Sequence, residues 1–190
     1  MKTKLISAIL LGAAVATPAL AEKPVDPNVQ EARQVIKQFF TRLKGELQSA
    51  MKAGGPVNAI EVCKLKAPKI TAEVSNQTGW RVARTSLKNR SPANAPTAWE
   101  KKVLEDFEAR KAAGADPKTL DHAEIAEVDG KRVFRYMKAI PTGQICLKCH
   151  GGKEVSPAVE ARLKELYPND KARGFKVGDI RGAFVLEKTL

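Results

Sequence analysis

Two cysteines and a histidine stand close together late in the chain, in the segment Cys146-Leu-Lys-Cys149-His150. Two glycines follow directly, so a helix that carries this motif must end just after His150. Residues 153–190 then have to form further structure of their own. The position of the motif therefore disfavours a bundle of long helices in which the last helix carries the site.

The C-x-x-C-H spacing has a chemical reason. Two thiols three residues apart can add to the two vinyl groups on one edge of a haem, and the next residue then brings its imidazole to the iron. A zinc half-site, a redox dithiol and a structural disulfide are the alternatives, and zinc would have to recruit Cys63 and His122. The motif predicts one haem c, attached through thioethers at Cys146 and Cys149, with His150 as an axial ligand.

The N-terminal segment predicts export. A basic start and an apolar run lead to Ala19-Leu-Ala21, which supplies the small residues that signal peptidase requires. We expect a signal peptide at residues 1–21, a lead-in at 22–28 and a single haem-binding domain at 29–190. The apolar run is too short to span a bilayer, so we expect a soluble periplasmic protein with no membrane span after cleavage.

The chain is strongly basic, with a formal net charge of +12 that falls to +10 once residues 1–21 are removed. A strongly positive charge is typical of proteins that bind nucleic acids. Export and an aromatic content of only 5% argue against it. We therefore expect no nucleic acid and interpret the charge as a surface for an acidic redox or signalling partner.

Helical periodicity dominates the first part of the chain. Apolar residues recur at helical spacing from Val29 to Met51, and Gly54-Gly55 ends that pattern. A second amphipathic stretch opens at Pro56, and Pro68 is expected to kink or break it.

Strand signals dominate the later part. Asp129-Gly130 is the strongest hairpin signal, and Thr97 with Glu100 forms a capping-box pattern that opens another helix. The chain is therefore expected to be α+β, with helices and an antiparallel sheet in one domain. The remaining predicted elements are a short strand or extended loop at 79–86, a loop at 88–96, hairpin strands at 124–128 and 132–140, a helix from Ser156-Pro157 to about 167, and a strand at 182–186.

The residues alone leave the second axial ligand open. Thiolate, imidazole and thioether groups are the strong candidates, which gives Cys63, His122, Met51, Met137 or an open site. Cys63 lies in the apolar stripe of a predicted helix, so burial as a small apolar residue is its alternative role. In an oxidising compartment, ligation to iron would protect this unpaired thiol.

Several separated blocks carry a family resemblance. Their order along the chain resembles that of the PAS-like haem c sensor domains of the periplasm, long catalogued as a domain of unknown function. The resemblance covers about residues 30–187. The blocks are Ala59-Ile-Glu-Val-Cys63-Lys-Leu-Lys-Ala-Pro68, Gly79-Trp-Arg-Val-Ala-Arg-Thr-Ser-Leu-Lys-Asn-Arg90, Ser91-Pro-Ala-Asn94-Ala-Pro96, Trp99-Glu100, the late Cys-x-x-Cys-His-Gly and Gly178-Asp-Ile-Arg-Gly182.

This resemblance implies a PAS-like antiparallel sheet flanked by helices, and the helical periodicity from Val29 to Met51 adds a long N-terminal helix. It also implies that Cys63 and His150 are the two axial ligands, as a thiolate/imidazole pair. The sequence departs from the family pattern at Ser91, where the family has asparagine, but both ligand positions are intact.

Basic residues follow the Cys63 segment, and a haem brings two propionates that arginine recognises well. We expect Arg84 or Arg90 to pair with a propionate.

Two functions fit these features. One is a redox or gas-sensing module that responds to a diatomic gas, and the other is a monohaem electron-transfer cytochrome c. A cytochrome c′-like bundle and a peroxidase are weaker alternatives. We expect no enzyme, because His122, the only other imidazole, falls in a predicted loop before a strand.

Overall fold

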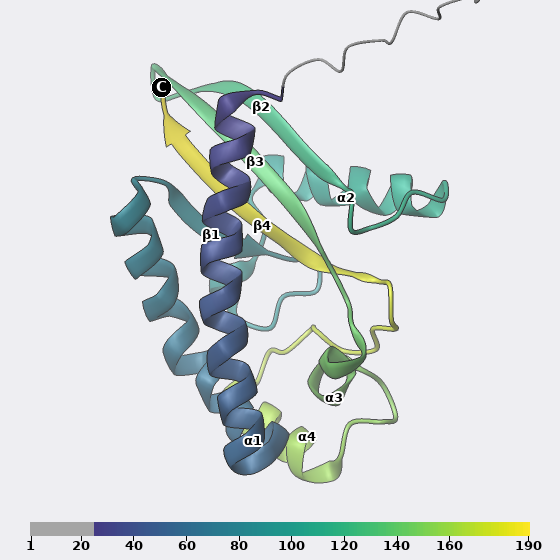
Figure 1. Ribbon diagram of the computed structural model, residues 1–190. Helices are drawn as coiled ribbons and strands as arrows, with labels where there is room; N and C mark the ends of the chain where they lie inside the picture. The colour runs from purple at the N-terminus through teal and green to yellow at the C-terminus, as the bar shows by residue number, and fades with distance from the viewer. Residues whose placement is uncertain (1–24) are drawn as a thin grey trace, which may run out of the picture.

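The computed structural model describes residues 25–190. The predicted signal peptide and residues 22–24 of the lead-in lie outside this part. The described chain is α+β, as predicted, with a four-stranded antiparallel sheet flanked by helices and a long N-terminal helix (Figure 1). Within residues 25–190, no helix has the length and apolar character needed to cross a membrane.

The N-terminal helix α1 (Pro27–Thr78) is two helical arms joined by a turn. Only Gly54 and Gly55 have non-helical backbone torsions inside it, and Gly55 has a φ of 68°, which suits glycine. The two arms lie side by side in Figure 1, and Lys66 of the second arm bonds Glu46 of the first at 2.5 Å. The predicted break at the glycine pair is confirmed.

Two details of α1 differ from expectation. The helix begins at Pro27, inside the predicted lead-in, because Asp26 accepts a hydrogen bond from the backbone N–H of Asn28 at 2.7 Å and proline suits the first turn. The helix also continues through Pro68, so the prediction of a break there is wrong. Ala67 and Ile70 on either side are buried, and this tertiary packing offsets the lost backbone hydrogen bond.

The sheet has the order β1-β4-β3-β2, and every neighbouring pair is antiparallel. Asp129 and Gly130 have φ values of 51° and 73° and close the predicted hairpin between β2 and β3. His122 lies within strand β2 rather than in a loop, opposite Met137. The strands are β1 (Arg81–Thr85), β2 (Asp121–Val128), β3 (Lys131–Pro141) and β4 (Ile180–Thr189).

The shorter helices follow their sequence signals. Thr97 and Glu100 form the expected capping box, and Ser156 accepts a hydrogen bond from the backbone N–H of Val159. These helices are α2 (Ala98–Ala112), α3 (Leu147–His150) and α4 (Pro157–Leu166), with short 3-10 turns η1 (Pro92–Asn94) and η2 (Gln144–Cys146).

Apolar side chains cover both faces of the sheet. Phe39 of α1 packs edge-on against Phe184 of β4 on one face, and Phe107 of α2 lies with Met137 on the other. A smaller cluster joins Ile60 of α1 to Leu163 of α4 at the lower end of the molecule in Figure 1, beside α3. The predicted site is thus built on the end of the molecule where α1 turns.

Candidate functional site

The C-x-x-C-H segment forms a compact turn. Cys146 ends the 3-10 turn η2, and Cys149 and His150 lie in the four-residue helix α3. A Cβ at Gly151 would lie 2.6 Å from the carbonyl oxygen of Leu147, so the residue after the motif has to be glycine to end the helix here. All three cysteines, including Cys63, are free and half-buried.

His150 is held in one orientation by a backbone contact. Its Nδ1 lies 3.0 Å from the carbonyl oxygen of Ala172, and an acceptor of this kind requires that Nδ1 carry the proton. The Nε2 lone pair is therefore free to bind a metal. Burial, followed by the charges of Arg181 and Arg90, holds the pKa of His150 well below its usual value, so the imidazole is neutral.

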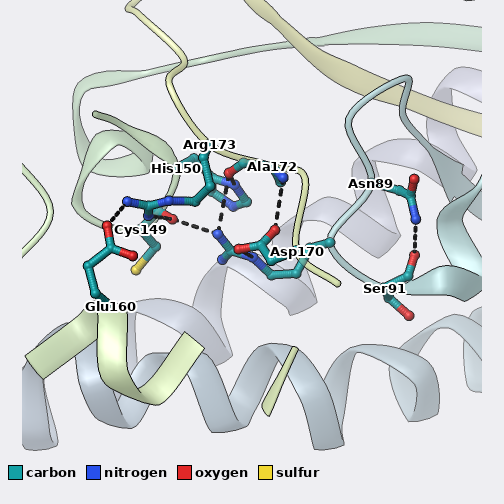
Figure 2. Close-up of polar contacts among 9 residues, drawn as sticks. Asn89, Ser91, Cys149, His150, Glu160, Asp170, Ala172 and Arg173 are labelled. Atoms are coloured by element: carbon teal, nitrogen blue, oxygen red, sulfur yellow. Dashed lines mark hydrogen bonds and ion pairs between the residues drawn. The ribbon is translucent and has the colours of Figure 1, made fainter. Parts of the chain in front are cut away.

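Arg90 holds the loop that supplies this acceptor. Its Nε donates to Asp170 at 3.0 Å, and its Nη2 donates to the carbonyl oxygens of Cys149 at 2.6 Å and Ala172 at 3.4 Å. Figure 2 shows Asp170 and Ala172 gathered around His150. Arg90 therefore ties the C-x-x-C-H helix to residues 170–172, and its predicted contact with a propionate stays a prediction.

Arg173 adds a second tie to the same helix. Its Nη1 donates to the carbonyl oxygen of Cys149 at 2.9 Å, and the other end of the guanidinium pairs with Glu160 of α4 (Figure 2). Two arginines thus converge on one backbone carbonyl, which fixes α3 against α4 and the following loop.

The structure brings Cys63 to the same place. Burial raises the pKa of the Cys149 thiol, Arg90 lowers it, and the nearby Cys63 thiol adds to the rise. The helical arm that carries Cys63 is fastened to α4, since Lys64 donates to the carbonyl oxygen of Leu166 at 3.0 Å. Cys63 therefore shares one end of the molecule with the motif although Cys146 comes 83 positions later in the sequence.

The other candidate ligands lie elsewhere or make other contacts. Met137 is fully buried in the core on the α2 face of the sheet. His122 bonds Glu124 at 3.1 Å on the edge strand β2. Met51 is half-buried just before the turn of α1. Trp80 is buried in the core and donates to Glu31 at 3.0 Å.

Sequence reasoning missed several residues of this site. Ala172 acts through its backbone carbonyl, which no side-chain pattern announces. Asp170 is an isolated acid in a loop, and its partner Arg90 is 80 residues away. Arg181 lines a cavity beside His150, and its segment Gly178-Asp-Ile-Arg-Gly182 was recognised only as one block of the family resemblance.

These residues fit a haem. Two free thiols stand within one turn, and the following imidazole is neutral with Nε2 available. A third free thiol lies nearby, and the buried Nε of Arg181 has no hydrogen-bond partner within the described residues. Sulfur and imidazole donors suit iron, and an unpaired arginine suits an anionic substituent.

Fold and site together define an α+β domain with a thiol and imidazole donor set at one end of its sheet. The chain belongs to the Tll0287-like family, whose model matches residues 21–188. Among solved structures, it is similar to the crystal structure of the cyanobacterial heme-protein Tll0287, with 25% sequence identity and a TM-score of 0.64. The match covers 87% of this chain and 96% of that chain. No curated protein matches the chain.

Proposed function

We propose that this protein carries one c-type haem, attached through Cys146 and Cys149, with His150 and Cys63 as the two axial ligands. The observation that carries the proposal is the bond from His150 Nδ1 to the Ala172 carbonyl, which leaves Nε2 available beside two free thiols. Membership in the Tll0287-like family and similarity to a heme-protein support it. When bound, the haem supplies one-electron redox chemistry and affinity for diatomic gases.

A haem stain after denaturing electrophoresis tests the covalent attachment. The full chain, matured in a host that attaches haem c, should keep its haem under denaturing conditions. The double variant C146A/C149A should lose it, and either single variant should show the altered haemochrome band of a single thioether. The matched control is Cys63→Ala, which removes the third cysteine and should keep covalent haem. Covalent haem in the double variant, or none in the wild type, would contradict the proposal.

The ferric absorption spectrum tests Cys63 separately. A thiolate ligand gives the iron a distinctive spectrum and favours the ferric state. Cys63→Ala should therefore change the ferric spectrum and raise the midpoint potential. The control is Met137→Leu, at a ligand candidate that lies in the other core. A ferric spectrum that is the same in Cys63→Ala and wild type would remove the thiolate assignment.

We further propose that the domain acts as an exported redox or gas-sensing module. Cys63 supports this role because it lies on an arm of α1 that joins the other arm through Gly54 and Gly55. In such a sensor Cys63 and His150 would hold the haem, and a diatomic gas would compete with Cys63 for the reduced haem. Carbon monoxide added to the reduced protein should change its spectrum, and an unchanged six-coordinate spectrum would argue against gas sensing. We propose no enzymatic turnover.

The basic charge favours electron transfer as a second function. The formal net charge of +10 that remains once residues 1–21 are removed would steer the protein toward an acidic redox partner. Electron exchange with an acidic carrier protein should then slow as the salt concentration rises. Rates that do not change with ionic strength would remove this argument.

Export is the remaining part of the proposal and has its own test. Residues 1–21 should be absent from the protein recovered from the periplasm, so its N-terminal residue should be Glu22. A periplasmic protein that still begins at residue 1 would contradict the predicted cleavage after Ala21.

A further inference from the structure

A cavity of about 40 Å³ lies beside His150, and its wall is rich in positive charge. Two of its four cations already have partners in the protein. Lys88 donates to the carbonyl oxygen of Arg173 at 3.1 Å, and Arg90 is paired with Asp170. The other two cations are Arg84 of β1 and Arg181 of β4.

Arg84 and Arg181 have no acidic partner among residues 25–190. The Nε of Arg181 is buried without a hydrogen-bond partner, and so is the hydroxyl oxygen of Thr85, which lines the same cavity. Leaving a buried donor unpaired costs free energy, and folded proteins rarely tolerate it without a ligand or water. Arg84, Arg181 and Thr85 can each donate a hydrogen bond to an anion, and they meet at a cavity where no acidic side chain of residues 25–190 pairs with the two arginines.

A β-bulge directs Arg181 into this cavity. Along β4, Gly182 pairs with Ile140 and Ile180 pairs with Pro141, so Arg181 is an extra residue with no partner on β3. Bulges of this kind redirect a side chain, and they are common next to functional sites. The hydroxyl of Ser86 donates to the backbone carbonyl of Arg181 at 2.7 Å and so fixes the bulged backbone.

Gly182 makes the bulge possible. Its φ is 153°, and a Cβ there would clash with the carbonyl oxygen of Thr85 on β1. The absence of a side chain therefore lets β1 and β4 approach at the point where Arg84, Thr85 and Arg181 meet. The sequence Arg181-Gly182 supplies both the cation and the flexibility that places it.

The two guanidinium groups are neighbours of like charge. Burial, and then the charge of Arg181, lower the pKa of Arg84 to about 10. The Arg84 guanidinium lies 5.7 Å from the centre of the Phe39 ring, which offers it only a weak cation–π contact. An anion between the two arginines would relieve their repulsion and complete their hydrogen bonds, and a planar carboxylate suits the guanidinium fork.

We propose that Arg84, Arg181 and Thr85 form a carboxylate-binding subsite that holds a propionate of the haem. This inference rests on the proposed haem binding and assigns the propionate to Arg84 and Arg181. Arg90 instead bonds Asp170 and the carbonyl oxygen of Ala172, and this carbonyl positions His150. A free anion could satisfy the same donors, so the experiment has to separate the two sources.

The test uses the full haem-loaded protein and the variant Arg181→Gln. Resonance Raman spectroscopy reports the propionate bending band, which shifts when its hydrogen bonding changes. We expect this band to shift in Arg181→Gln and in Arg84→Gln, and the midpoint potential to fall in both because a cation near the iron is lost. Arg181→Lys should keep more of the wild-type potential than Arg181→Gln.

Arg135→Gln is the matched control. Arg135 lies on the same sheet and also has a buried Nε without a hydrogen-bond partner, but it stacks on Trp99 away from the cavity. The Arg135→Gln variant should leave the propionate band unchanged. If Arg181→Gln fails to fold by circular dichroism, the Arg181→Lys and Arg84→Gln proteins decide the question by the same band.

Two outcomes would overturn the subsite. One is covalently bound haem whose propionate band is the same in wild type, Arg181→Gln and Arg84→Gln. The other is a response to inorganic phosphate, added at rising concentration, that shifts the potential of the wild type but not of Arg181→Gln, which would assign the cavity to a free anion. Failure of the proposed function looks different, because the wild-type protein would then carry no covalent haem.

Discussion

The Nε atom of Arg90 lies 3.0 Å from Oδ2 of Asp170, and only 10% and 9% of the two side chains are exposed. This ion pair connects the loop after β1 to the loop after α4. The Nη2 atom of Arg90 donates hydrogen bonds to the carbonyl oxygens of Cys149 and Ala172. One buried pair therefore stabilises both the helix that carries His150 and the carbonyl to which His150 donates.

Replacement of Asp170 by asparagine should destabilise the protein strongly. The change leaves the buried guanidinium of Arg90 without a counter-charge, and breaking a buried pair from one side typically costs about 3–5 kcal/mol. Urea unfolding should show a loss of free energy in this range. The control is Glu73→Gln, whose pair with Arg42 is exposed, and it should change the free energy of unfolding by less than about 1 kcal/mol. Equal effects for the two variants would contradict the prediction.

Gly182→Ala should distort the junction of β1 and β4. A Cβ would clash with the Thr85 carbonyl, and strained backbone of this kind costs about 1–3 kcal/mol. We expect a lower melting temperature and a smaller fraction of protein that carries covalent haem. In contrast, Gly45→Ala on the surface of α1 meets nothing within 4 Å and should stabilise the protein by about 0.5–1 kcal/mol. A neutral Gly182→Ala would show that the junction can relax.

Stability should fall in acid because of Asp121. Burial alone would raise the pKa of Asp121, but hydrogen bonds from Arg33 at 2.7 Å and Tyr136 at 2.7 Å outweigh it and leave the pKa below its usual value. The stabilisation is therefore complete above the unfolded-state pKa of about 3.9 and is lost as the pH falls through the lower folded-state value.

The comparison of wild type with Asp121→Asn by chemical unfolding between pH 2 and 6 measures this effect. The variant should lose less stability on acidification than wild type, and the two free energies of unfolding should converge at low pH. Parallel curves across the whole range would assign the acid sensitivity to other carboxyl groups.

Met137→Leu should leave the haem spectrum unchanged. Met137 is fully buried among the residues that α2 covers, and leucine has nearly the same volume. Such a swap usually costs less than about 1.5 kcal/mol. A changed ferric or ferrous spectrum would reopen the question of methionine ligation that the residues alone could not resolve.

Local signals predicted most of the elements. Asp129-Gly130, the capping box at Thr97 and the glycine pair at 54–55 each specify backbone geometry within a few residues, and the structure contains all three features. The helix does not break at Pro68, because tertiary packing of the flanking residues outweighs a local preference. His122 was assigned to a loop although pairing with β3 extends strand β2 to Asp121.

The Cys and His donors could be predicted because the chemistry of haem attachment fixes their spacing in the sequence. The residues that surround these donors could not be predicted. C-x-x-C-H is contiguous, but the acceptor for His150 is the backbone of Ala172, and the bulge that redirects Arg181 depends on register with β3. Both features arise from pairings between distant segments, which hydrophobic periodicity does not encode.

The sheet order places the last strand of the chain in the middle of the fold. β4 lies between β1 and β3, and the contact between Arg81 and Glu187 spans 106 residues. β1 therefore has no strand to pair with until β4 at Ile180–Thr189 is available, and such long-range pairing slows folding. A chain cut short before residue 180 would keep Cys146, Cys149 and His150 yet leave their end of the sheet unassembled, so the thiols would be available before the pocket around them exists.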